Sequence, residues 1–172
     1  MSIKASLSAE SARDYGTVVS QVKPGSDREA TMRMVVDALW EAMKDRGVSW
    51  LGFYTKPAGA EEMILGPRRD KPACSPLGLH GICGQSFTAR RPIIVDDSAA
   101  LSTGNYIACD PRDRAEVVIP LFEADGSCWG VLDVDSHEPG VFGQNDVVGL
   151  RRVVERVGLS VPQNPPAMTL RM

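Results

Sequence analysis

The chain has 172 residues, of which 43% are hydrophobic, and its formal net charge is −3. This length suits one domain with a complete hydrophobic core, and the acidic balance offers no basic surface for nucleic acid or an acidic membrane. No apolar run approaches the length of a membrane span, and the first residues lack the apolar segment of a secretory signal. We therefore expect a cytoplasmic protein with no nucleic-acid or membrane partner.

The first part of the chain predicts two helices followed by a strand. They cover residues 8–22, 26–47 and 48–55. Ser26 and Glu29 have the spacing of a capping box, so we place the start of the second helix at Ser26. In the strand, Trp50 and Tyr54 share one side.

The middle of the chain alternates short elements with two long loops. The pattern predicts a strand over 62–67, a loop over 68–79 with Cys74, a helix over 81–90 with Cys83, a strand over 93–95 and a loop over 96–114 with Cys109. Long loops inside a compact domain are usually functional or disordered. Because each of these loops carries a cysteine, we favour a functional role.

Residues 115–123 and 128–136 form the strongest predicted hairpin. Both runs are rich in β-branched residues, and Ala124-Asp125-Gly126-Ser127 between them is a turn sequence. A turn centred on Asp125 and Gly126 places Glu116 opposite Asp135 and Val118 opposite Asp133.

This register gathers three carboxyl groups on one face of the hairpin. Glu116, Asp133 and Asp135 emerge together, whereas the opposite face is aliphatic and includes Cys128. Like charges on neighbouring strands repel, and a solvated polar face is the alternative explanation. We favour a functional site, because Trp129 and other apolar residues are expected on the same face as the acids.

The last part of the chain predicts a helix over about 145–158 and a disordered tail over 162–172, which contains three prolines. We therefore expect one α+β domain over 1–161, with the N- and C-terminal helices packed on one face of an antiparallel sheet.

Four cysteines in a chain without an export signal indicate a reducing compartment. The spacing of Cys74, Cys83, Cys109 and the two histidines matches no usual zinc motif, so we predict no metal. Thiol redox chemistry fits better, because cysteines in Gly- and Pro-rich segments are expected to be accessible. Cys128 on the aliphatic face is expected to be an inert core residue.

Six short motifs, taken in order, resemble the free methionine-(R)-sulfoxide reductases, a family built on a single GAF domain. They are W50-L-G-F-Y54, G66-P with K71-P-A-C74, G81-I-C-G84, I107-A-C-D110, E116-V-V-I-P-L121 and V131-L-D-V-D-S136. Together they span most of the folded chain. The resemblance implies a GAF-like fold and a thiol-dependent reductase.

The resemblance also implies residue roles. Cys109 would attack the sulfoxide, Cys74 would resolve the resulting sulfenic acid, and Cys83 would be an auxiliary thiol. The acids Glu116, Asp133 and Asp135 would hold the sulfoxide oxygen and the substrate ammonium group, with Trp50 and Tyr54 forming the wall around the S-methyl group. Thioredoxin would supply the electrons, and no further cofactor is expected.

Two alternatives remain open on the sequence alone. The chain could be a non-catalytic GAF module that binds a small ligand, or a redox sensor in which Cys74 and Cys109 form a reversible disulfide. The terminal helices also make a homodimer a reasonable expectation.

Overall fold

A seven-stranded sheet organises the computed structural model, which describes residues 13–69, 73–102, 104 and 106–172. The strands are β1 (Trp50–Thr55), β2 (Glu62–Arg69), β3 (Leu77–Gly78), β4 (Ile93–Val95), β5 (Ala115–Phe122), β6 (Cys128–Ser136) and β7 (Leu170–Arg171). The helices are α1 (Tyr15–Gln21), α2 (Arg28–Met43), α3 (Ile82–Ala89) and α4 (Gln144–Arg156), with a short 3-10 turn η2 (Ser98–Ala100). The sheet order is β3-β2-β1-β6-β5-β4-β7. None of the described helices is long and apolar enough to span a membrane.

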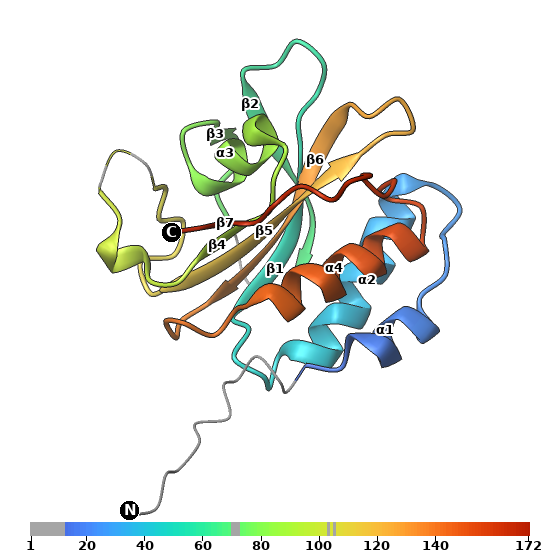
Figure 1. The fold of residues 1–172 in the computed structure, drawn as a ribbon, viewed down its shortest axis with the longest axis horizontal. Coiled ribbons are helices and arrows are strands. Elements are labelled where there is room, and N and C mark those ends of the chain that lie inside the picture. Colours follow the sequence, from blue (N-terminus) through green and yellow to red (C-terminus); the bar gives the residue numbers. More distant parts are fainter. Residues whose placement is uncertain (1–12, 70–72, 103, 105) are drawn as a thin grey trace, which may run out of the picture.

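Three helices cover one face of the sheet, as the sequence predicts, and α3 lies on the other (Figure 1). The larger core fills the space between α1, α2, α4 and the sheet, where aliphatic residues such as Leu39, Leu132 and Leu150 are completely buried. Burial of this apolar surface is the main source of stability for such a two-layer arrangement. The sheet therefore has a helix-covered face and a second face available for a site.

One buried ion pair lies on the helix-covered side. Arg13 Nε donates to Asp146 Oδ1 over 2.6 Å, and the Tyr15 hydroxyl donates to the same oxygen over 2.6 Å. The backbone N–H of Gly143 donates to Asp146 Oδ2 over 2.9 Å. These contacts tie the chain before α1 to the start of α4, and they give the buried carboxylate a full set of partners.

The starts of the first two helices differ from their predicted positions. The N-cap of α2 is Asp27, whose carboxylate accepts from the N–H of Ala30 over 2.8 Å, so the predicted capping box at Ser26 is wrong. A carboxylate is a good acceptor for the free N–H groups of a first turn. The α1 helix begins after its N-cap Asp14, and the part of the predicted helix over residues 8–12 lies outside the described residues.

The C-terminal segment departs from the prediction of a disordered tail. Its strand β7 pairs in parallel with β4, which makes the otherwise antiparallel sheet mixed. The N–H of Leu170 donates to the Pro92 carbonyl, and that of Met172 to the Ile94 carbonyl, both over 2.8 Å. The tail pairs here because β4 leaves backbone donors and acceptors at the sheet edge, and those groups bind a neighbouring strand.

The central hairpin has the predicted register. Glu116 lies opposite Asp135, and Val118 lies opposite Asp133. Beyond this point a bulge between Leu121 and Phe122 changes the pairing, and the expected positions of two residues are wrong as a result.

The bulge moves Trp129 to the helix-covered core and keeps Cys128 out of it. The Trp129 ring lies 4.3 Å under the guanidinium of Arg28, and its Nε1 donates to the Leu159 carbonyl over 3.0 Å. Cys128 lies opposite Phe122 and is only partly buried. A bulge inserts an unpaired residue, so side-chain alternation cannot be extrapolated through it.

Candidate functional site

A small pocket opens on the sheet face that carries α3. Side chains from β1, α3, β5, β6 and the loop before β5 line it. The residues predicted for a site that line this pocket are Trp50, Tyr54, Cys83, Cys109, Glu116, Asp133 and Asp135. The sequence-based grouping of aromatic, thiol and acidic residues is therefore present in space.

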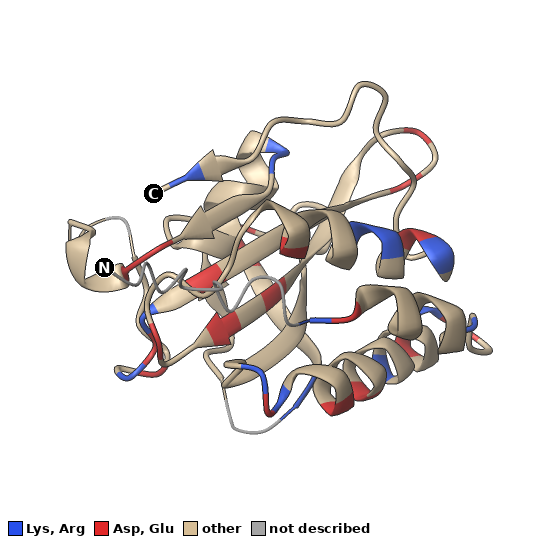
Figure 2. Cartoon of the chain, turned by 60° about the horizontal axis from the view of Figure 1, so that its bottom comes forward, with Lys and Arg blue, Asp and Glu red and all other residues tan. Residues whose placement is uncertain are grey.

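The three acids occupy neighbouring positions on the strands β5 and β6. Figure 2 shows acidic segments of the sheet in red. Glu116 and Asp133 are each 6% exposed, and Asp135 is half-buried. Asp133 Oδ1 is buried and has no hydrogen-bond partner among the described residues. A buried acceptor without a partner is costly, and it is a feature typical of binding sites.

Burial and mutual repulsion favour the protonated acids. Burial, followed by the proximity of Asp133 and Asp135, raises the pKa of Glu116 well above its usual value. Burial raises the pKa of Asp133 to about 7, although hydrogen bonds from Cys83 and Glu116 act in the opposite direction. The acid group can therefore carry a proton at neutral pH.

Two aromatic rings from β1 line the same pocket. Trp50 lies opposite Asp135 and Tyr54 opposite Val131, so the register places both rings on the face of the acids. Their ring centroids are 6.2 Å apart. The Tyr54 hydroxyl donates to the Cys74 carbonyl over 3.0 Å, which connects the aromatic wall to the cysteine loop.

Cys74 and Cys109 form a disulfide, with 5.5 Å between their Cα atoms. Cys109 is exposed and Cys74 is partly buried, and the bond joins the two long loops predicted to carry function. This is the pairing that the resemblance implies. The individual roles of nucleophile and resolving thiol remain predictions.

Cys83 is not accessible in the way the sequence predicts. It lies in the first turn of α3, is 3% exposed, and its Sγ is 3.9 Å from Glu116 Oε1. Burial, followed by the nearby Asp133 and Glu116, raises the pKa of the Cys83 thiol. The helix lies directly on its preceding loop, because Gly84 approaches Leu79 so closely that a Cβ would lie 2.2 Å from the Leu79 Cα. Cys83 is therefore a protonated, covered thiol in this structure.

The loop around Cys109 contributes pocket residues that were not predicted as site residues. Tyr106, Ile107, Asp110 and Asp113 line the pocket. Burial, then the nearby Glu116 and Asp135, raises the pKa of Tyr106. The only sequence signal for these residues was their position beside Cys109, because irregular loops have no periodicity that reveals side-chain direction.

Two groups of potential metal ligands occur among the described residues. The first group is Cys83, Glu116 and Asp133, and the second is Asp110, Asp113 and His137. Within each group, one possible ligand atom from each residue lies within 4.8 Å of those from the other two. In the second group the guanidinium of Arg112 already binds both oxygens of Asp110, over 3.1 and 3.0 Å. The absence of a metal stays a prediction.

Comparison with known proteins gives a consistent pattern. A family model described as "GAF domain" matches residues 25–161. The free methionine-R-sulfoxide reductase of Saccharomyces cerevisiae is 32% identical over 126 residues, which are 71% of this chain and 69% of the relative.

Two solved structures have the same fold at about 30% identity. Free methionine-R-sulfoxide reductase from Neisseria meningitidis, in complex with its substrate, has a TM-score of 0.73 and 31% identity, covering 85% of this chain and 87% of its own. A putative GAF sensor protein from Burkholderia vietnamiensis has a TM-score of 0.74 and 30% identity, covering 85% and 92%. The fold is thus shared by proteins described as a reductase and as a sensor.

Proposed function

Because the chain belongs to the free methionine-R-sulfoxide reductase family of GAF domains, we propose that it reduces free L-methionine-(R)-sulfoxide with its own thiols. One observation carries the proposal: Cys109, disulfide-bonded to Cys74, lines the same pocket as three clustered acids. A domain that only binds a ligand has no need for paired thiols at its pocket, and a sensor has no need for the acids.

In the proposed reaction, the Cys109 sulfur of the reduced protein attacks the sulfoxide sulfur. The S–O bond breaks, methionine leaves, and the oxygen is retained as a sulfenic acid on Cys109. The Cys74 thiol then attacks Cys109 Sγ, which forms the disulfide and releases water. The sulfoxide gains two electrons, and the two thiols lose two electrons and two protons.

The acids provide the proton and the recognition of a free amino acid. A protonated carboxyl group, held at neutral pH by the raised pKa values of Glu116 and Asp133, donates to the sulfoxide oxygen as the S–O bond breaks. The ammonium group of the substrate binds the remaining carboxylate charge, including Asp135. Trp50 and Tyr54 enclose the S-methyl group.

The proposed cycle ends when an external dithiol reduces the Cys74–Cys109 disulfide. Thioredoxin is the proposed donor, and the exposed position of Cys109 supports access by a protein partner. The proposed auxiliary role of Cys83 requires its sulfur, which is covered in this structure, to become accessible.

The test is turnover of a diastereomeric mixture of free methionine sulfoxide with dithiothreitol as reductant. We expect loss of the R form alone, and a decrease of about three orders of magnitude in Cys109→Ser, which lacks the nucleophile. Cys128→Ser is the matched control for a general effect of cysteine removal. The reductase proposal fails if neither diastereomer is consumed; reversible formation of the Cys74–Cys109 disulfide with peroxide would then favour the redox sensor.

A further inference from the structure

Cys109 leads into a tight turn that holds two buried carboxylates. The N–H of Asp113 donates to the Asp110 carbonyl over 3.1 Å, and the N–H of Arg112 donates to Asp110 Oδ1 over 3.0 Å. Asp110 is 8% exposed and Asp113 is 7% exposed. Carboxylates buried to this extent need donors nearby, and the source of those donors determines what holds the turn.

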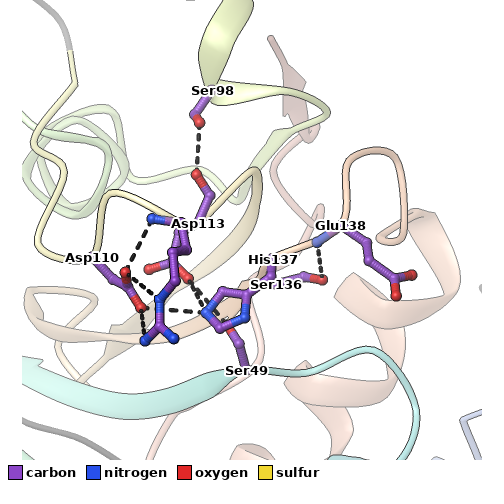
Figure 3. A network of polar contacts seen from close by, with 8 residues as sticks. Ser49, Ser98, Asp110, Asp113, Ser136, His137 and Glu138 are labelled. Carbon is purple, nitrogen blue, oxygen red and sulfur yellow. Dashed lines mark hydrogen bonds and ion pairs between the residues drawn. The ribbon is translucent and has the colours of Figure 1, made fainter.

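His137 lies between the two carboxylates, as Figure 3 shows. Its Nε2 is 3.3 Å from Asp110 Oδ2 and 3.4 Å from Asp113 Oδ1. The tautomer that carries its hydrogen on Nε2 donates to Asp110 and lies within ion-pair distance of Asp113. His137 directly follows β6 and is two residues beyond Asp135, so it connects the Cys109 turn to the strand that carries two of the pocket acids.

Other hydrogen bonds to Asp110 and Asp113 come from different parts of the chain. Arg112 belongs to the same turn as Asp110, so its contact cannot fix the turn relative to the sheet. Ser98 Oγ donates to the Asp113 carbonyl over 2.9 Å, but it lies in the same long loop as Cys109. Ser49 Oγ donates to Asp113 Oδ1 over 3.1 Å from the residue before β1. The backbone N–H of Arg114, next to Asp113, donates to the Ser136 carbonyl over 2.7 Å, so the turn has these contacts to the sheet besides those of His137.

We propose that His137 is a positioning residue, which holds the Cys109 turn against the end of β6 when the disulfide is reduced. In the oxidised protein the bond to Cys74 restrains Cys109. Reduction removes that restraint before the sulfur has to attack, and the contacts of His137 to Asp110 and Asp113 then keep the thiol near the acids and near Cys74. Its effect on turnover rests on the proposed function, whereas its effect on the disulfide does not.

The first measurement is the equilibrium between the Cys74–Cys109 disulfide and dithiothreitol at fixed pH. A pre-positioned thiol pair has a high effective concentration and resists reduction. We expect His137→Ala to lower this effective concentration roughly fivefold, the size of one ordinary lost hydrogen bond. His137→Gln, which keeps an N–H donor at the end of its side chain, should recover most of the loss.

Sulfoxide turnover gives the second measurement. His137 is not among the residues that line the pocket, so we expect His137→Ala to lower kcat while KM for the sulfoxide stays within about twofold. Tyr15→Phe is the matched control, because it removes a buried hydrogen bond to Asp146 on the far side of the sheet. It should lower thermal stability and leave the disulfide equilibrium unchanged.

The proposal is overturned if His137→Ala leaves the disulfide equilibrium at the wild-type value, or if Tyr15→Phe shifts it equally. If His137→Ala does not fold, Ser49→Ala removes another side-chain contact between the turn and the sheet. It should shift the equilibrium in the same direction by a smaller factor, and no shift would count against the proposal. A shifted equilibrium in a protein that consumes no sulfoxide would support the positioning role and reject the reductase.

Discussion

The two faces of the sheet bury charge in opposite ways. On the helix-covered face, Asp146 receives hydrogen bonds from Arg13, Tyr15 and the backbone of Gly143. On the pocket face, Glu116 and Asp133 are buried next to each other and to the Cys83 thiol. Burial, followed by the nearby Asp133 and Asp135, raises the pKa of Glu116.

The difference separates a stabilising arrangement from a functional one. A buried carboxylate with a guanidinium partner keeps its charge and holds two chain segments together. Carboxyl groups buried next to other carboxyl groups lower the stability of the folded state. Such clusters occur at binding and catalytic sites, where their shifted pKa values serve the function. Substitutions on the two faces should therefore have opposite effects on folding and on activity.

Asp146→Ala should give the largest change in stability. It leaves Arg13 charged and buried without its partner, so we expect a loss of roughly 3–5 kcal/mol in the free energy of unfolding. Denaturant unfolding measures this loss. Under conditions where the variant stays folded, its KM for the sulfoxide should match the wild type, and a changed KM would mean that the two faces are not independent.

Asp133→Asn should raise the free energy of unfolding rather than lower it, and the size of this increase should depend on pH. The folded protein binds the Asp133 proton more tightly than the unfolded chain does, since burial raises the pKa from 3.8 to about 7. The cost to stability is therefore absent below about pH 4, grows as pH rises, and is complete above about pH 7, where it amounts to at most about 4 kcal/mol. We expect the wild type to lose stability between about pH 4 and pH 7, as measured by denaturant unfolding.

The Asn variant should lose less stability than the wild type over that pH interval. Asp125→Asn, at an exposed acid in the hairpin turn, is the control and should follow the wild type. Identical pH profiles for Asp133→Asn and the wild type would show that burial of this carboxyl group is not costly.

Asp135→Asn tests recognition rather than folding. Removing a charge that binds the substrate ammonium group should raise KM for free methionine sulfoxide roughly tenfold to a hundredfold, the range for hydrogen bonds to charged groups. Steady-state kinetics measure this change. A KM within twofold of the wild type would remove Asp135 from the binding site.

Cys128→Ser should have the smallest effect. The side chain is partly buried near the hairpin end and does not line the pocket. We expect turnover to change by less than about twofold, with a small change in melting temperature. A large loss of turnover would link the hairpin end to the chemistry.

The sequence predicts the regular parts of this site well. Alternation along a strand and the Asp125-Gly126 turn are enough to group Glu116, Asp133 and Asp135, because side-chain period and turn length determine register. The prediction fails at Trp129 and Cys128, since a bulge has no signal in an alternating pattern.

Packing and long-range strand pairing account for the other differences between the sequence-based prediction and the structure. The burial of Cys83 depends on how closely α3 lies on the sheet, which the sequence of one short helix does not specify. The pairing of β7 with β4 joins segments more than seventy residues apart, and nothing in the Pro-containing tail indicates its partner. His137 was missed because its role depends on a loop brought to it by the fold.

The short strands at both margins of the sheet have a consequence for association between molecules. β3 and β7 are two residues long each, so these two strands offer few free backbone groups to a strand from another molecule. Short outer strands are one way in which proteins prevent sheet-to-sheet polymerisation. Neither of these two outermost strands therefore favours a dimer that extends the sheet.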